Sequence, residues 1–209
     1  MKKTKNLIKI AIDSPAAAGA GTLAKSISKH YNLLYVDTGK AYRVLAMYKI
    51  NNPKKFNISF AQKKIKKLKI KDLNKKKLLS NKIGTEASIL AKQKSIRNLV
   101  HKFQIKNAYS PPKRYSGSCL DGRDITYNIV PDADFKFFIT ANIKIRALRR
   151  YKELRQLNMK ISYKEVLKSL KLRDKRDYSR KIAPLKKTKD SILINTTNLS
   201  KRACFLKIK

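Results

Sequence analysis

Short apolar runs alternate with longer amphipathic patterns along most of the chain, and this alternation predicts a parallel sheet covered by helices. The runs with the length and composition of strands lie at residues 7–12, 33–36, 134–140 and 191–195, with one more ending at residue 121. Helical patterns lie at about 22–30, up to about residue 50, at about 85–107, at 141–154, and from residue 162 onward. We therefore expect an α/β fold whose ligands bind at the carboxyl ends of the strands.

Residues 51–83 interrupt the alternation because they are rich in lysine and only weakly periodic. We interpret them as a small peripheral insert that is partly helical. The chain, residues 1–209, is long enough for one domain, with its core at 1–50 and 85–205 and a reduced insert at about 51–84. Ser162 and Glu165 have the spacing of a capping box, which predicts that a helix begins there.

The charge of the chain is strongly unbalanced. Lysine and arginine number 52 against 13 aspartates and glutamates, which gives a formal net charge of +39. A field of this size attracts polyanions such as nucleic acid, nucleotides or an anionic membrane surface. The lysines are scattered along the whole chain and accompany abundant Asn and Ile, which is typical of drift in base composition. We favour drift over selected nucleic-acid binding, and both interpretations stay open.

Cysteine content and the start of the chain bear on the cellular compartment. Cys119 and Cys204 are too few for a disulfide framework or a metal cluster, which favours a reducing cytosol. The basic start "MKKTKNLIKIAI" has an apolar run that breaks at Lys9, too short for a signal segment or a membrane span. We therefore expect a cytoplasmic protein with no membrane partner.

The stretch "IAIDSPAAAGAGTLAKSI" joins a strand to a helix through a loop of small residues. Backbone N–H groups at such a helix start form a cradle for phosphate, and Thr22 can place its hydroxyl on Mg²⁺. The residues expected to bind a nucleotide are Ser14, Pro15, Ala16, Ala17, Ala18, Gly19, Ala20, Gly21 and Thr22. Ala20 stands where the phosphate-binding loop ordinarily has a lysine. Taken alone, this turn is as consistent with simple packing as with nucleotide binding.

Six motifs in order resolve that ambiguity: "DSPAAAGAGT", "DTGKAYR", "DGRD", "PDADFKFFITANIKIRALRR", "RDKRDYSRKIAPL" and "NTTNLS". In these motifs the chain resembles the bacterial cytidylate kinase family from residue 10 to about residue 200. The resemblance implies a P-loop nucleoside monophosphate kinase fold, a central parallel sheet flanked by helices, with a shortened insert and a small lid at about 150–180. It implies transfer of the γ-phosphoryl group of ATP to CMP or dCMP with Mg²⁺, by a monomer that does not require nucleic acid.

The same resemblance assigns the site residues. Those that would hold CMP are Thr38, Arg43, Ser88, Arg97, Arg123, Asp124, Arg173, Asp177 and Arg180. Among them, Arg123, Arg173 and Arg180 would also act in catalysis, because phosphoryl transfer needs converging guanidinium groups. Arg149 and Arg150 resemble the lid arginines that cover ATP.

The chain also departs from the family pattern. Ser14 and Ala20 replace a glycine and the loop lysine, Asn195 replaces an aspartate, and the insert and the C-terminal helix are shortened. We hypothesise that Lys40, which stands where the family has a small residue, supplies the missing ammonium, whereas Lys25 should point away. The alternative interpretation is a catalytically degenerate kinase fold that acts as a basic nucleic-acid-binding protein, and another acceptor such as UMP stays open.

Overall fold

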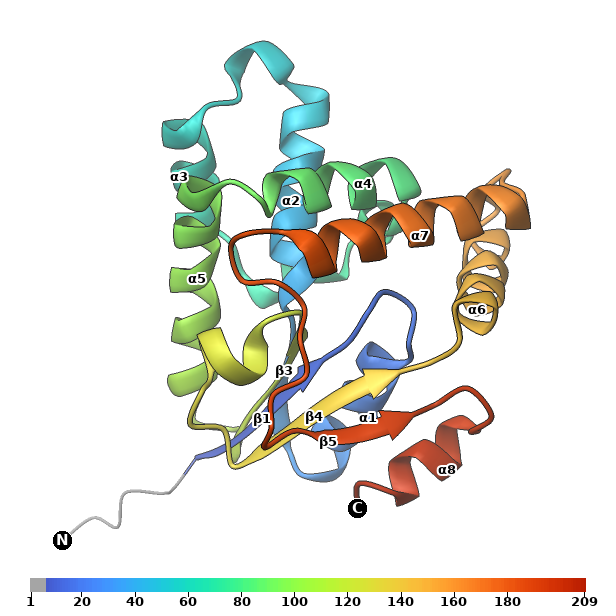
Figure 1. The fold of residues 1–209 in the computed structure, drawn as a ribbon. Helices are drawn as coiled ribbons and strands as arrows, with labels where there is room; N and C mark the ends of the chain where they lie inside the picture. The colour runs from blue at the N-terminus through green and yellow to red at the C-terminus, as the bar shows by residue number, and fades with distance from the viewer. Residues whose placement is uncertain (1–6) are drawn as a thin grey trace, which may run out of the picture.

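A computed structural model describes residues 7–209 and contains a five-stranded parallel sheet (Figure 1). The basic start of the chain, residues 1–6, lies outside the described residues. The strands are β1 (Ile8–Asp13), β2 (Leu33–Asp37), β3 (Gly117–Gly122), β4 (Phe135–Thr140) and β5 (Ile192–Asn195), in the spatial order β2-β3-β1-β4-β5. All five predicted strands are present, and the expected α/β fold is confirmed.

The register of the central strands brings three carboxylates to one edge of the sheet. Asp13 of β1 lies opposite Gly122 of β3, and Asp37 of β2 lies opposite Asp121 of β3. The connection after β1 crosses the sheet toward β2, and the connection after β3 crosses it in the opposite direction, toward β4. The crevice beyond the carboxyl ends of β1 and β3 is therefore the expected ligand site.

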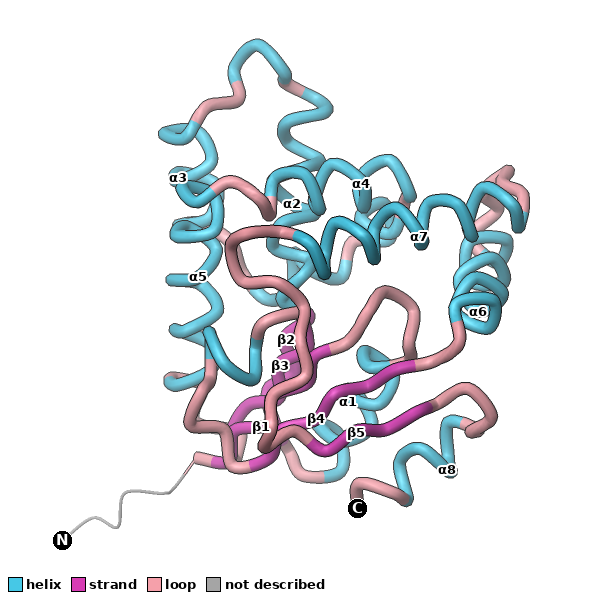
Figure 2. The backbone as a smooth tube through the Cα atoms, viewed as in Figure 1, coloured by secondary structure: helices cyan, strands magenta, loops and turns pink. Residues whose placement is uncertain are grey.

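Helices cover both faces of the sheet, as the tube view also shows (Figure 2). On one face, α1 (Ala20–His30) and the short α8 (Lys201–Leu206) pack against Ile10 and Ile12. On the other face, α2 (Thr38–Asn51) and α5 (Lys94–Tyr109) pack around Ala11 and its neighbours. Successive β1 side chains thus enter opposite cores, which explains why residues 10–12 are apolar without interruption instead of alternating with polar residues.

The insert contains helix α3 (Ile58–Lys66) and short 3₁₀ turns, and the described residues 51–84 hold no strand. The helix predicted over 85–107 is wrong as a single element. It is divided into α4 (Asn81–Leu90) and α5 by a tight turn at residues 91–93. Arg97 stabilises this break, because its guanidinium donates to the Ala91 carbonyl at 3.2 Å. No glycine or proline marks the turn, so the local pattern contained no signal for it.

Helices α6 (Ile143–Gln156) and α7 (Tyr163–Ser179) form a hairpin beyond the carboxyl edge of the sheet (Figure 1). The predicted capping box is confirmed, since the Ser162 hydroxyl accepts from the Glu165 N–H at 3.2 Å and the Glu165 carboxylate accepts from the Ser162 N–H at 2.7 Å. A small apolar cluster joins the hairpin to Ala16 of the loop after β1. Within residues 7–209, no helix is long and apolar enough to cross a membrane.

Candidate nucleotide-binding site

A cavity of about 820 Å³ lies at the carboxyl edge of the sheet, between the loop after β1 and the helices α2, α4, α6 and α7. Its volume lies within the range of about 300–1,000 Å³ that small-molecule sites occupy. The predicted site residues that line it are all nine loop residues from Ser14 to Thr22, with Lys40, Arg43, Arg123, Arg149, Arg150 and Arg173. One cavity therefore collects residues from five separate motifs.

The loop after β1 turns directly into α1, which begins at Ala20, two residues earlier than predicted. Gly19 caps the helix with φ 97°, and Ala17 also has a left-handed φ of 60°. The first backbone N–H groups of α1 have no partner within the helix, so they are available to phosphate oxygens. The loop thus keeps its anion cradle without its lysine.

Gly19→Ala is expected to destabilise the fold by about 1–2 kcal/mol, because a left-handed φ forces a Cβ against the following carbonyl. Space is not the cause, since an added Cβ would lie 3.7 Å from the nearest atom, the Thr196 hydroxyl. Gly39→Ala is the matched control in the first turn of α2, and it should be neutral or stabilising. Urea unfolding measures both, and equal midpoints for the two variants would contradict the expected strain.

Arg43, Arg123, Arg150 and Arg173 bring four guanidinium-bearing side chains to the cavity lining. Asp177 pairs with Arg123 at 2.8 Å and lies 3.7 Å from Arg173, so it serves two cations at once. The Arg173 Nε is buried and has no hydrogen-bond partner among the described residues. Burial and the nearby Arg123 lower the pKa of Arg173 to about 9. The cluster is short of negative charge and suits a dianion such as phosphate.

Backbone carbonyls at the edge of the insert accept from two of these arginines. Arg43 donates to the carbonyls of Leu78 at 2.6 Å and Ser80 at 3.3 Å, and Arg150 donates to the Leu79 carbonyl. Gly84 makes room for Arg43, because a Cβ there would lie 2.8 Å from the guanidinium. Burial and the nearby Arg150 lower the pKa of Arg43 to about 10. Arg150, expected to cover ATP, therefore also contacts the edge of the insert next to the carbonyls that bind Arg43.

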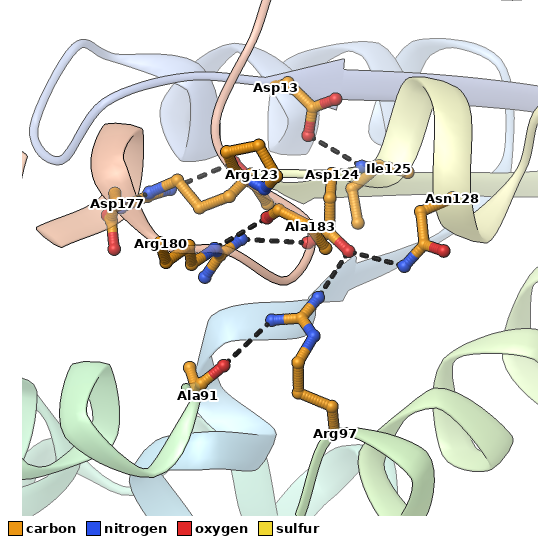
Figure 3. Close-up of polar contacts among 12 residues, drawn as sticks. Asp13, Ala91, Arg97, Arg123, Asp124, Ile125, Asn128, Asp177, Arg180 and Ala183 are labelled. Atoms are coloured by element: carbon orange, nitrogen blue, oxygen red, sulfur yellow. Dashed lines mark hydrogen bonds and ion pairs between the residues drawn. The ribbon is translucent and has the colours of Figure 1, made fainter. Parts of the chain in front are cut away.

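Asp124 forms a buried ionic network with Arg97 and Arg180 (Figure 3), and none of these three residues lines the cavity. Asp124 accepts from Arg97 at 2.5 Å and from Asn128 at 2.7 Å, and its other oxygen lies 3.4 Å from Arg180. Six of the residues predicted to hold CMP lie outside the cavity lining: Thr38, Ser88, Arg97, Asp124, Asp177 and Arg180. Two of these are occupied elsewhere, because Thr38 donates to the Asp121 carbonyl and Ser88 accepts from Arg176.

Asp13 connects the sheet to this network. Its buried carboxylate accepts the N–H groups of Ile125 at 2.8 Å and Thr126 at 2.9 Å and the Thr126 hydroxyl at 2.7 Å. Burial raises the pKa of Asp13 to about 6, while these hydrogen bonds oppose the rise. The contacts fix the start of a π-helical turn at Ile125–Ile129 and so place the preceding "DGRD" motif at the cavity edge.

Sequence reasoning did not single out three residues near the loop: Tyr35, Asp37 and Asp121. Asp121 lies beneath Gly21, where a Cβ would meet its carboxylate at 3.3 Å and the Tyr35 hydroxyl at 3.2 Å. The Asp121 Oδ1 and the Tyr35 hydroxyl are buried without a hydrogen-bond partner in the described part of the chain. Burial and the nearby Asp37 raise the pKa of Asp121 well above its usual range. The available signal was that both β2 and β3 end in aspartate.

Arg146 is a fourth missed residue, and it joins the loop to the α6–α7 hairpin. Its guanidinium donates to the Ala16 carbonyl at 3.1 Å and forms two hydrogen bonds with Asp174, at 3.1 and 2.6 Å. Its Nε donates to the Ala141 carbonyl at 3.0 Å. Because this buried cation is fully paired, its role is to position the loop, and it is not free to bind phosphate.

Arg149 and Asn195 both contact the segment that follows β5. Arg149 donates to the hydroxyl and the carbonyl of Thr196, at 2.9 and 2.6 Å, and that hydroxyl donates to the Ala18 carbonyl of the loop at 2.7 Å. Asn195 accepts from the N–H and hydroxyl of Thr197, at 3.0 and 2.6 Å. An amide oxygen here makes the contacts that the family's aspartate could make, so this departure leaves the local geometry intact.

Lys40 lines the same cavity as the lysine-free loop. Its side chain is 13% exposed, and its Nζ lies 3.7 Å from the Asp37 carboxylate, a loose pair that leaves donors free. The expectation that Lys25 points away is wrong, because Lys25 also lines the cavity, with its Nζ 5.8 Å from the centre of the Tyr35 ring. Lys25 is more exposed than Lys40.

Comparison with known proteins agrees with this geometry. A family model described as cytidylate kinase matches residues 10–208. Cytidylate kinase of Bartonella tribocorum is 41% identical over 201 residues, covering 94% of this chain and 90% of that protein. Cytidylate kinases of Thermosipho melanesiensis and Mesomycoplasma hyopneumoniae are 40% and 37% identical, covering 92% and 93% of this chain and 90% and 88% of the relatives.

A solved structure shares the fold. The crystal structure of an uncharacterized protein from Eubacterium ventriosum superimposes with a TM-score of 0.54 at 16% sequence identity, covering 96% of this chain and 95% of the other. This likeness bears on architecture alone. The match of the family model over nearly the whole chain, together with the three relatives, shows that the chain belongs to the cytidylate kinase family.

Proposed function

We propose that this protein transfers the γ-phosphoryl group of ATP to CMP or dCMP, giving ADP and CDP or dCDP. The observation that carries the proposal is that Arg43, Arg123 and Arg173 line the same cavity as the anion cradle of the loop. A donor phosphate on the loop and an acceptor phosphate on the arginines would then face each other. The names of the relatives support cytidylate as the acceptor.

On the donor side, the loop from Ser14 to Thr22 holds the β- and γ-phosphates through its backbone N–H groups. Arg149, which is fixed to Thr196 beside the loop, and Arg150 cover the nucleotide from α6. Residues of about 150–180, in the α6–α7 hairpin, act as the lid. Closing it over ATP excludes water and so prevents hydrolysis of ATP in place of transfer.

On the acceptor side, Arg43, Arg123 and Arg173 hold the phosphate of CMP. An oxygen of that phosphate attacks the γ-phosphorus in line, the new P–O bond forms as the bond to the β-phosphate oxygen breaks, and ADP leaves. No side chain acts as a nucleophile. Arg123 and Arg173 stabilise the spread negative charge of the transition state, which is how phosphoryl transfer is accelerated. Arg180, which lies outside the cavity lining, would join them by family resemblance. Asp177 holds Arg123 in place.

The base and sugar of CMP belong beside the buried network. By family resemblance, Ser88, Arg97 and Asp124 help to hold CMP, with Ser88 able to contact an edge of the base. Thr38, Asp177 and Arg180 complete the acceptor site. These side chains now bond to one another or to the backbone. Binding CMP would exchange some of these internal contacts for contacts with the nucleotide.

The residues around the loop fit a hard divalent cation such as Mg²⁺. The unpartnered Asp121 Oδ1 and the Asp37 carboxylate offer oxygen atoms near the loop, and Thr22 opens toward the cavity. No group of three or more His, Cys, Asp or Glu residues forms an all-protein metal cage within residues 7–209. Thr22, Asp37 and Asp121 would therefore hold the ion together with phosphates, and the ion would neutralise charge on the β- and γ-phosphates.

Lys40 replaces the missing loop lysine in this proposal. It lines the cavity from the first turn of α2, the helix that follows β2, and its partner Asp37 is 3.7 Å away. An ammonium does not need a particular origin in the chain, because it acts on phosphate as a point charge.

The test is Mg²⁺-dependent formation of ADP from ATP, with CMP, dCMP, UMP and AMP as separate acceptors. CMP and dCMP should support turnover, and AMP should not. UMP at equal efficiency would assign a broader pyrimidine specificity and contradict the proposed one. Absence of turnover with every acceptor, in a protein that shows a cooperative unfolding transition, would overturn the proposed function and favour the degenerate nucleic-acid-binding alternative.

A further inference from the structure

The insert, residues 51–84, contains twelve lysines, no arginine and one acidic residue, Asp72. The lysines are Lys54, Lys55, Lys63, Lys64, Lys66, Lys67, Lys69, Lys71, Lys75, Lys76, Lys77 and Lys82. This is a local concentration within an already basic chain.

These lysines are on the surface and almost unpaired. All are exposed except Lys64, which lies over the rings of Tyr48 and Phe60 at 4.7 and 5.1 Å from their centres. In residues 7–209 the one ion pair that they form joins Lys75 to Asp72 at 3.2 Å. The outer surface of the insert is therefore a field of cations without counter-charges.

The apolar side chains of the insert hold this surface in place. Ala61, Ile65, Leu73 and Leu78 are buried in the core that α2 and α5 share. Among the large apolar side chains of α3, Ile58 is the one with substantial exposure, at 43%. The insert thus presents charge on a folded scaffold, and it lacks the broad apolar face that a helix needs to enter a lipid surface.

The kinase site does not use this charge. The insert contributes Leu79, Asn81 and Gly84 to the cavity lining, and none of its twelve lysines. Helix α7 offers a contrast within the same chain, because its lysines alternate with Glu165, Asp174 and Asp177. Drift in base composition accounts for many lysines everywhere, but the insert is denser in lysine than the rest of the chain, with twelve in 34 residues.

We infer that the exposed lysines of the insert form a binding surface for the phosphate backbone of duplex nucleic acid, separate from the nucleotide cavity. A duplex carries about one charge per 1.7 Å of its axis, the densest polyanion that such a surface meets. Contacts by lysine to phosphate confer no base specificity. Stacking of single-stranded bases is disfavoured, since Phe56 and Phe60, the two aromatic side chains of the insert, are half-buried.

The experiment compares two charge-matched variants of the full chain. The insert variant changes Lys63, Lys66, Lys67 and Lys71 to Gln, and the control changes the equally exposed Lys164, Lys168, Lys171 and Lys175 of α7 to Gln. Both lose the same net charge. Binding of a short, fluorescently labelled DNA duplex of mixed sequence is titrated from about 50 to about 200 mM KCl, the range in which phosphate contacts lose affinity steeply.

The insert variant should bind at least about tenfold more weakly at about 100 mM KCl, with a salt slope shallower by about 2 to 4, since each lost phosphate contact removes about 0.9. The control should keep the slope of the parent. Equal losses in the two variants would mean that binding follows net charge alone and would overturn the inference. So would parent protein that binds phosphatidylserine vesicles more tightly than the duplex. Phosphorylation of CMP by the insert variant should be unchanged, so this test is independent of the proposed kinase activity.

Discussion

Lys40→Ala is expected to lower kcat for CMP phosphorylation about 100-fold or more, the size of effect seen when one donor to a developing negative charge is removed. The reason is that Ala20 leaves the loop without a side-chain cation and Lys40 lines the same cavity, loosely held by Asp37 at 3.7 Å. KM for ATP should change much less, because backbone N–H groups of the loop supply most ground-state contacts. Steady-state kinetics with varied ATP measure both quantities.

Two further variants decide whether the ammonium is what matters. Lys25→Ala removes the same charge from another lysine of the cavity, and it should retain activity within a few-fold. Ala20→Lys in the Lys40→Ala background restores an ammonium at the loop position where the family has a lysine. Its kcat should be at least about tenfold higher than that of Lys40→Ala alone. Equal losses of kcat in Lys40→Ala and Lys25→Ala, or no recovery of kcat in the double variant, would refute the hypothesis that Lys40 substitutes for the loop lysine absent at Ala20.

Arg173→Gln is expected to lower kcat/KM for CMP about 1,000-fold, as when an arginine that neutralises a transferring phosphoryl group is lost. The same change should leave the thermal unfolding midpoint unchanged or raise it. The buried Arg173 Nε makes no hydrogen bond within the described residues, and the Asp177 carboxylate, 3.7 Å away, pairs more closely with Arg123. Burial together with the nearby Arg123 lowers the pKa of the Arg173 guanidinium to about 9. Removing the Arg173 cation in the absence of ligand relieves its repulsion with Arg123. Activity should therefore fall while stability does not.

The matched control for Arg173→Gln is Lys175→Gln, an exposed change of equal charge on the same helix. It should affect neither quantity. Arg173→Lys should recover part of the activity, because an ammonium keeps the charge but cannot form two parallel hydrogen bonds with phosphate. A fall in the unfolding midpoint of Arg173→Gln with kcat/KM preserved would instead make Arg173 a structural residue.

Periodicity and motif order were sufficient to predict the strands, the fold and the loop, because each depends on contiguous residues. β-branched runs form buried strands, and small residues between a strand and a helix form the phosphate cradle. The capping box at Ser162 was predictable for the same reason, since its hydrogen bonds span three residues.

Side-chain pairing across the fold was not predictable from local pattern. The break between α4 and α5 depends on the Arg97 side chain, whose other partner, Asp124, is 27 residues away. Motifs predicted nine acceptor residues as one group, but three of them line the cavity and six do not. Arg146 and Asp121 were missed because their roles arise from contacts with Ala16 and Gly21, far away in the sequence.

The contacts of Arg146 bear on how the two substrates affect each other. One guanidinium binds the loop carbonyl of Ala16 and, through Asp174, the helix that carries Arg173. A shift of the loop on binding ATP would therefore act, through Arg146 and Asp174, on the helix that carries Arg173. Because binding free energies are linked reciprocally, any factor by which bound ATP changes the affinity for CMP is also the factor by which bound CMP changes the affinity for ATP. Through the contacts of Arg146, the binding of one nucleotide would change the affinity for the other before any phosphoryl group is transferred.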